Sequence, residues 1–282
     1  MLWRQCAIRY SEKHPAIAHE GNVMPQLADI IDLSAHPIDD AAFRARCRQT
    51  LARAGALVLP GFLRPAALAT VRLEGAEQHH AAFYASSKHN VYLRPQDDAL
   101  PADHARNRLV VSSKGCITDE DIPSQSPLRA LYDAPAFREF LCAVLDEAQL
   151  YPYADRLSSI NLHYAHTGQE LGWHFDNSSF AITLLIQKPQ GGGRFEYVEN
   201  LRDADRGEMN YAGVTQVLDG ERAVKQLAME EGDLVLFRGR NAMHRVTPTE
   251  GDTTRMLVVL AYNAQPDVML SESARMTFYG RL

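Results

Sequence analysis

The sequence has only four cysteines, and their positions exclude two common roles. Cys6, Cys47, Cys116 and Cys142 lie far apart, and no two of them form a C-x-x-C pair. Zinc knuckles need closely spaced pairs, and small disulfide frameworks need a much higher density of cysteine. We therefore expect reduced thiols in a cytoplasmic protein.

Long apolar runs and an excess of positive charge are also missing. No apolar stretch approaches the roughly 18 residues that cross a membrane, and the N-terminal residues lack the apolar core of a secretory signal. The formal net charge is -6, whereas nucleic acids and anionic membranes attract basic surfaces. We expect a soluble protein that binds neither nucleic acid nor membrane.

The first half of the chain has mostly helical patterns. After an irregular arm over residues 1 to about 37, Asp39 or Asp40 can cap a helix that runs to about Ala54, with Gly55 at its end. The other elements expected in this half are a short strand at 56–63, a helix over 64–87 and a helical pair over 126–150 that breaks before Pro135.

After Tyr151 the pattern changes to short β-rich runs separated by Gly, Pro and Asn. The candidate strands lie at 158–166, 180–187, 193–198, 223–229, 232–239 and 254–263. Runs this close together, with almost no helix between them, favour antiparallel pairing in a sandwich or barrel. We predict one domain over 1–282, mainly β, with helical support and a lid in about 1–150 and the β core in about 151–282.

One short motif in the β-rich half predicts metal ligands. In "WHFD", His174 and Asp176 flank Phe175, so both point to the same face of a strand. Such a triplet alone proves little, but His244 follows in a polar connection just beyond another strand. Two histidines and one carboxylate form a facial set that leaves three positions open on Fe(II). A bidentate 2-oxo acid takes two of these positions and O₂ takes the third.

Arg255 opens the last apolar run, "TRMLVVL". A buried guanidinium is costly unless an anion pairs with it, and it can bind the distal carboxylate of a 2-oxo acid through two hydrogen bonds. The alternative is that Arg255 begins an edge strand and points to water.

These motifs resemble those of a known family. "HFD", "HRVTPTEG" and Arg255 are similar to the metal and co-substrate motifs of Fe(II)/2-oxoglutarate-dependent dioxygenases. The segments that resemble the bacterial branch acting on free amino acids, by halogenation or hydroxylation, are "WHFDNSSFAITLLIQ", "GGGRFEYVENLRDAD", "VLDG", "GDLVLFRGRNAMHRVTP" and "YGR". The resemblance covers about residues 158–282. It implies a double-stranded β-helix (jelly-roll or cupin-like) core, Fe(II), 2-oxoglutarate and O₂ as reactants, and oxidation of a small molecule with release of succinate and CO₂.

Asp176 bears on which reaction such an enzyme performs. Halogenating members of the branch have Gly at this position, which frees a coordination position for chloride. Because this chain has the carboxylate, we expect a hydroxylase, or an enzyme that oxidises a C–H bond in another way.

The strand before the metal motif holds candidate cofactor contacts. Alternation places Asn161 and His163 on one face of "INLHYAH" and Leu162 and Tyr164 on the other. Related enzymes contact 2-oxoglutarate through polar residues of this strand, so we predict Asn161 and His163, with Tyr164 as the alternative. His163 could instead be a hydrogen-bonded core residue.

Candidate substrate contacts are less specific. Asn177 follows the metal motif and Arg240 precedes His244, while Arg108 lies in the polar segment 92–115 that we interpret as a lid. All of them could equally be solvated.

The wall that continues the face of Arg255 is apolar, with Leu257, Val259 and Ala261 in alternation. It disfavours a long cationic substrate such as lysine and favours a less polar amino acid or a derivative.

Two other classes of function stay open at this stage. One is a cupin-type isomerase or hydrolase that binds a metal without 2-oxoglutarate, which Arg255 argues against. The other is a non-catalytic sensor of the same fold, which the intact ligand set argues against. The sequence leaves open whether the substrate is free or carrier-bound, and whether the chain forms a homodimer.

Overall fold

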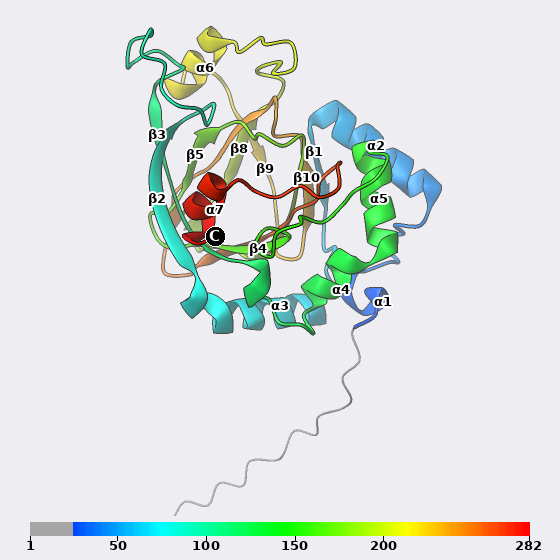
Figure 1. Ribbon diagram of the computed structural model, residues 1–282. Coiled ribbons are helices and arrows are strands. Elements are labelled where there is room, and N and C mark those ends of the chain that lie inside the picture. Colours follow the sequence, from blue (N-terminus) through cyan, green and yellow to red (C-terminus); the bar gives the residue numbers. More distant parts are fainter. Residues whose placement is uncertain (1–24) are drawn as a thin grey trace, which may run out of the picture.

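The computed structural model describes residues 25–282 (Figure 1). Cys6 and most of the predicted N-terminal arm lie outside the described residues. The other three cysteines are free thiols, as their spacing predicts.

Most strands belong to one antiparallel sheet that curls around an interior (Figure 1). The strands are β1 (Ala56–Leu59), β2 (Phe83–Asn90), β3 (Leu109–Ile117), β4 (Ile160–Ala165), β5 (Leu171–His174), β6 (Ala181–Gln187), β7 (Gly191–Gly192), β8 (Phe195–Val198), β9 (Lys225–Leu227), β10 (Leu234–Phe237), β11 (Met243–Val246), β12 (Thr249–Glu250) and β13 (Arg255–Leu260). The order in the sheet is β1-β10-β6-β13-β4-β3-β5-β11-β8-β9, with β2 paired to β3 and with β12 and β7 as a separate pair. The predicted jelly-roll architecture is confirmed.

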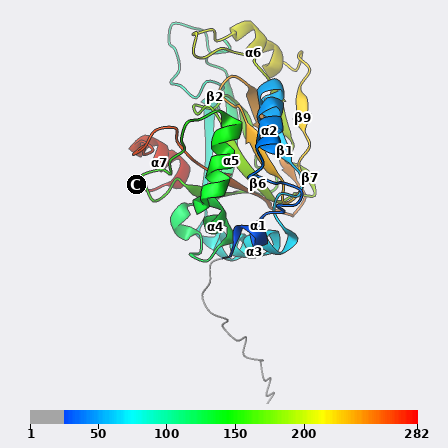
Figure 2. The same ribbon diagram turned by 90° about the vertical axis from the view of Figure 1, so that its right-hand side faces the viewer.

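The helices lie mainly outside this sheet. They are α1 (Leu27–Ile30), α2 (Ala41–Ala54), α3 (Pro65–Gln78), α4 (Pro127–Asp133), α5 (Pro135–Leu145), α6 (Tyr211–Leu218) and α7 (Glu272–Tyr279), with short 3-10 turns at His79–Ala81 and Asp119–Asp121. The carboxylate of Asp40 caps α2 by accepting a hydrogen bond from the Phe43 amide, and Gly55 ends it in the left-handed conformation, as predicted. Figure 2 shows α2 and α5 side by side against the sheet.

The central strands bury both of their faces. One face packs on the N-terminal helices and forms the main hydrophobic core, which includes Ile160, Leu162, Ile182, Leu184, Leu234, Leu236, Met256 and Val258. The other face of the same strands lines an interior cavity, with Asn161, His163, Thr183, Val235, Arg255 and Leu257. Alternation along each strand therefore separates structural side chains from those available for chemistry.

Two predictions for the first half are wrong. The helix expected over 64–87 ends at Gln78, and Phe83–Asn90 forms the strand β2. The segment 92–115 is not one long connection, because β3 begins at Leu109. β2 pairs only with β3 and most of its side chains are exposed, so no apolar period marked it as a strand.

Two helices in the second half were not expected. α6 and α7 have eight residues each and begin with side-chain caps, from Asn210 and Ser271 respectively. Val214 and Val217 of α6 pack in a small core with Trp173. No helix within residues 25–282 has the length and apolar character to cross a membrane.

The triple-glycine segment provides a test of the fold. Gly192 has a φ of 62°, and a Cβ there would lie 1.9 Å from the Pro248 carbonyl oxygen. Gly192→Ala should therefore lower the free energy of unfolding by about 3 kcal/mol, because both the conformation and the contact oppose a side chain. Urea denaturation would measure the change.

The matched control is Gly207→Ala, whose φ is 74° with nothing within 4 Å of the added Cβ. It should cost only about 1 kcal/mol, the cost of the left-handed conformation. Equal losses in the two variants would contradict the close approach of Pro248.

Candidate metal centre and its cavities

Three side chains meet on the inner face of the sheet. β5 and β11 are antiparallel neighbours in which His174 lies directly opposite His244, and their ring centroids are 4.2 Å apart. The Oδ1 atom of Asp176 lies 3.7 Å from Nε2 of His174 and 3.5 Å from Nε2 of His244. Within residues 25–282, this is the only cluster of three or more His, Cys, Asp or Glu side chains close enough to hold a metal ion.

Backbone carbonyls orient both imidazoles. Nδ1 of His174 lies 2.7 Å from the Gly172 carbonyl oxygen, and Nδ1 of His244 lies 2.9 Å from that of Ala242. Because a carbonyl oxygen only accepts, each Nδ1 carries the proton and donates it. In the neutral form of each imidazole, Nε2 then offers a lone pair on the side of Asp176, which is the tautomer that metal ligation requires.

The protonation states of Asp176, His174 and His244 also favour the binding of a cation. Burial alone would raise the pKa of Asp176, but the charge and hydrogen bond of His244, together with the charges of His174 and Arg202, outweigh burial and lower the pKa to about 2. Burial and the neighbouring His244 lower the pKa of His174 to about 3. At neutral pH, Asp176 is therefore an anion and His174 is neutral. Burial would lower the pKa of His244, but Asp176 raises it, so a proton or a metal ion can bridge this pair.

Gly239 makes room for the carboxylate. The amide of Asp176 donates to the Gly239 carbonyl at 3.1 Å, and a Cβ on Gly239 would lie 1.8 Å from Oδ2 of Asp176. On the other side, the Arg202 guanidinium stacks 4.1 Å from the centre of the Phe175 ring and donates to the Asp176 carbonyl. Neither supporting residue was predicted from the sequence.

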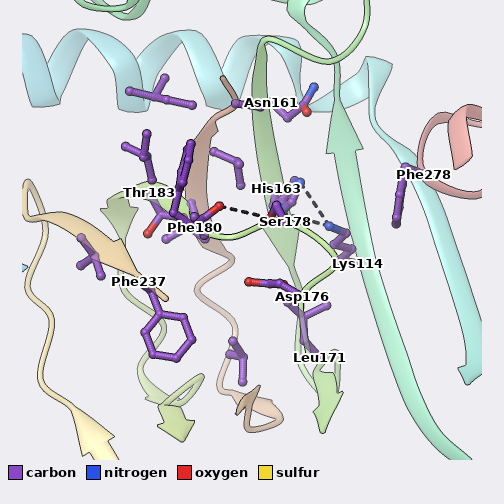
Figure 3. A pocket seen from close by; sticks show the side chains of 18 of the residues that line it. Lys114, Asn161, His163, Leu171, Asp176, Ser178, Phe180, Thr183, Phe237 and Phe278 are labelled. Carbon is purple, nitrogen blue, oxygen red and sulfur yellow. Dashed lines mark hydrogen bonds between the residues drawn. The ribbon is translucent and has the colours of Figure 1, made fainter. Parts of the chain in front are cut away.

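Two cavities adjoin this cluster: all three side chains line the inner cavity, and His174 and Asp176 also line the outer one. The inner cavity, of about 340 Å³, lies inside the curled sheet and is lined by Asn161, His163, Thr183, Arg255, Leu257 and Val259 among others. Figure 3 shows Asn161, His163 and Thr183 on its wall. The outer cavity, of about 820 Å³, is lined by Ser87, His89, Arg94, Ser112, Asn177 and Thr277 among others. Both cavities share Lys114, Leu171, His174, Asp176 and Phe278.

Arg255 lies on the wall of the inner cavity with only 6% of its surface exposed. β13 lies between β4 and β6, which excludes the alternative of an edge strand facing water. Burial lowers the pKa of its guanidinium to about 10, so it stays charged at neutral pH. Among the described residues, no carboxylate forms an ion pair with it. An anionic ligand is what this charge lacks.

The residues of β4 divide as the alternation predicts. His163 and Asn161 face the inner cavity. The Asn161 side chain is already engaged, since its amide donates to the Leu157 carbonyl at 2.7 Å and its oxygen accepts from the Tyr279 hydroxyl at 3.0 Å. Tyr164 is corrected as a cofactor contact, because it lies in the main core and its hydroxyl donates to the Gly75 carbonyl at 2.7 Å.

Of the three predicted substrate contacts, one lines a cavity beside the metal centre and two do not. Asn177 is exposed and lines the outer cavity. Arg108 and Arg240 instead form ion pairs at 2.6 Å with Asp219 and Asp205, respectively, and line neither cavity, so the structure does not bring them to the site. The inner cavity is also lined by Leu257, Val259 and Ala261, as the alternation predicts.

Lys114 is the most prominent residue that the sequence did not indicate. It lies on β3 and lines both cavities, and its Nζ atom lies 3.1 Å from each ring nitrogen of His163. Burial lowers the pKa of Lys114. Burial, Lys114 and Arg255 together lower the pKa of His163 well below its usual value, so this imidazole is neutral.

A family model described as "HalD: Halogenase D" matches residues 40–277. The chain belongs to this family. The match includes both strands that carry the metal ligands, together with Lys114 and Arg255. No curated protein sequence matches the chain.

Solved structures share the fold of this Halogenase D family member at low identity. The carbocyclase SnoK of nogalamycin biosynthesis has a TM-score of 0.55 and 12% identity over 84% of this chain and 92% of its own. The epimerase SnoN, in complex with Fe3+, alpha ketoglutarate and nogalamycin RO, has a TM-score of 0.52 and 14% identity over 79% and 84%. A 2OG-Fe(II) oxygenase family oxidoreductase from Burkholderia pseudomallei has a TM-score of 0.51 and 13% identity over 80% and 92%.

Because Gly239 lies so close to Asp176, we predict that a substitution at 239 weakens metal binding although all three proposed ligands are kept. Gly239→Ala should displace the Asp176 carboxylate and reduce Fe(II) binding at least tenfold, close to the loss in His244→Ala, where a ligand is absent. Anaerobic equilibrium dialysis with metal analysis would measure binding.

His80→Ala is the control, because His80 is exposed and outside both cavities. It should bind Fe(II) like the wild type. Full metal binding by Gly239→Ala would show that Asp176 does not need the space beside residue 239.

Proposed function

We propose that this chain is an Fe(II)- and 2-oxoglutarate-dependent oxygenase that hydroxylates a small molecule, or otherwise oxidises one of its C–H bonds, with release of succinate and CO₂. The observation that carries the proposal is a two-histidine, one-carboxylate set on the wall of a cavity that also contains the unpaired cation Arg255. A metal-binding isomerase or hydrolase has no need of that cation.

Different residues of the chain would bind the metal and the cofactor. His174, Asp176 and His244 would hold Fe(II), and they leave positions open for other ligands because no fourth protein ligand lies nearby in the described chain. The bound iron and 2-oxoglutarate would supply the oxidising power from O₂. Arg255 would hold the distal carboxylate of 2-oxoglutarate, and Leu257 and Val259 would keep water from this end of the cavity.

Asp176 supports hydroxylation over halogenation, although the family is described as a halogenase family. A carboxylate on the metal occupies the position that chloride would need. The missing Cβ at Gly239 fits this reading, because the space beside residue 239 is filled by the Asp176 carboxylate.

The substrate class, a free amino acid or a derivative, rests on the resemblance of the segments around the metal ligands to the amino-acid branch. The structural relatives SnoN and SnoK are described as an epimerase and a carbocyclase, so C–H oxidation with an outcome other than hydroxylation stays within the proposal.

Arg255→Ala tests the cofactor assignment. It should weaken 2-oxoglutarate binding about 30-fold or more, because a desolvated charged pair is lost, while Fe(II) binding stays intact. Anaerobic titration of the visible charge-transfer band that Fe(II) and 2-oxoglutarate form together would measure the constant.

Arg108→Ala is the matched control, since its guanidinium is paired with Asp219 outside both cavities. An unchanged constant for 2-oxoglutarate in Arg255→Ala would remove this residue from the cofactor site.

The reaction itself is tested by a screen of free amino acids for substrate-dependent succinate release, followed by mass spectrometry of the product in chloride buffer. The wild-type product should be heavier by one oxygen atom or lighter by two hydrogen atoms, even in high chloride. Asp176→Gly should lose most of this activity. A dominant product with the chlorine isotope pattern would overturn both the hydroxylase reading and Asp176 as a ligand.

A further inference from the structure

Lys114 lies at the boundary of the two cavities. Its strand pairs with β4, and Lys114 shares the inner face of the sheet with His163 and Cys116. Figure 3 shows its side chain turned towards His163, with Asp176 and Phe278 in the same part of the cavity. The Nζ atom lies 5.8 Å from the centre of the Phe278 ring, on the helix α7.

The ammonium of Lys114 makes fewer hydrogen bonds than it can donate. It can donate three hydrogen bonds, and in residues 25–282 its only hydrogen-bond partner is the ring of His163. That imidazole is neutral and carries no compensating charge. A partly buried ammonium with one neutral partner is less stable than one paired with an anion, so an anionic ligand would stabilise it.

The proposed cofactor does not supply that anion. One carboxylate of 2-oxoglutarate would be held by Arg255 and the other would bind the metal with the 2-oxo group. Fe(II), Asp176, Arg255, Lys114 and a doubly charged 2-oxoglutarate together leave one positive charge uncompensated. A single carboxylate on the substrate would neutralise the site.

The side chains that line the outer cavity also carry more positive than negative charge. The ionisable side chains that line it are Lys88, His89, Arg94, Lys114, His174 and Asp176. Asp176 is the one carboxylate among them, and a bound metal would occupy it. A substrate with a cationic side chain would therefore find two or more cations and no free carboxylate there.

We infer that Lys114 binds the carboxylate of the substrate, and that the outer cavity thereby selects neutral or acidic amino acids over those with a cationic side chain. This inference rests on the proposed function and specifies its substrate class. Lys114 would place the substrate near His174 and Asp176, because all three side chains line both cavities.

The experiment uses anaerobic full-length protein with Fe(II) and 2-oxoglutarate, titrated with each free L-amino acid while the charge-transfer band is recorded. Neutral or acidic amino acids should perturb the band, and lysine and arginine should not. The carboxamide of the tightest-binding amino acid should bind at least about tenfold more weakly, because it cannot pair with an ammonium.

Two variants of Lys114 separate charge from shape. Lys114→Met keeps the length and removes the charge, and it should weaken binding of the tightest amino acid by about tenfold to a hundredfold. Lys114→Arg keeps the charge and should retain most of the affinity. The constant for 2-oxoglutarate should not change in either variant, and the band itself shows that each variant is folded. Lys188→Met, in an exposed ion pair with Glu230, is the control and should match the wild type.

The outcomes that overturn the inference are distinct. If Lys114→Met weakens 2-oxoglutarate binding and leaves the amino acid unaffected, Lys114 belongs to the cofactor. If lysine or arginine binds tightest, if the carboxamide binds equally well, or if no amino acid perturbs the band, charge selection is wrong while the cofactor proposal stands. If the wild type forms no band, the proposed function fails and the inference fails with it.

Discussion

The direct pairing of His174 with His244 across β5 and β11 is the constraint on which the site depends. Strand side chains alternate between faces, so a slip of one residue would turn His244 away from the cavity. The opposite face holds the register. Arg245 stacks 4.8 Å from the centre of the Trp173 ring and pairs with Glu196 on β8 at 2.8 Å. Trp173 and Arg245 each adjoin a metal ligand, so contacts outside the cavity position the two imidazoles inside it.

The same division between faces explains how the interior tolerates so much charge. The helices cover the outer face of β4, β6, β10 and β13 and bury a continuous apolar core there. Burial of apolar surface stabilises the sheet without any contribution from the cavity side. The inner face can then carry Arg255, Lys114 and three ionisable ligands, whose desolvation opposes folding until ligands are bound.

The parts of this site that could be predicted from the sequence are those with local signals. His174 and Asp176 are two residues apart on a strand, and Arg255 opens an apolar run, so alternation alone assigns their faces. Asp40 and Gly55 mark the ends of α2 for a similarly local reason. Lys114 had no such signal, because its importance depends on the pairing of β3 with β4, about 50 residues apart. The ion pairs of Arg108 with Asp219 and of Arg240 with Asp205 had no local signal for the same reason, since they form only in the folded chain.

The contact between residues 176 and 239 adds a constraint to the choice of reaction. In this chain the Asp176 carboxylate fills the space that a Cβ at position 239 would need, so Asp at 176 and any side chain at 239 exclude each other. Removing the carboxylate alone would take away one of the three proposed metal ligands and also leave a gap beside Gly239. A gap of that kind lets the ligand strand relax, because side chains around a void lose their contacts on one side. The proposed assignment of Asp176 as a ligand therefore depends on two positions, because the carboxylate keeps its place only while residue 239 has no side chain.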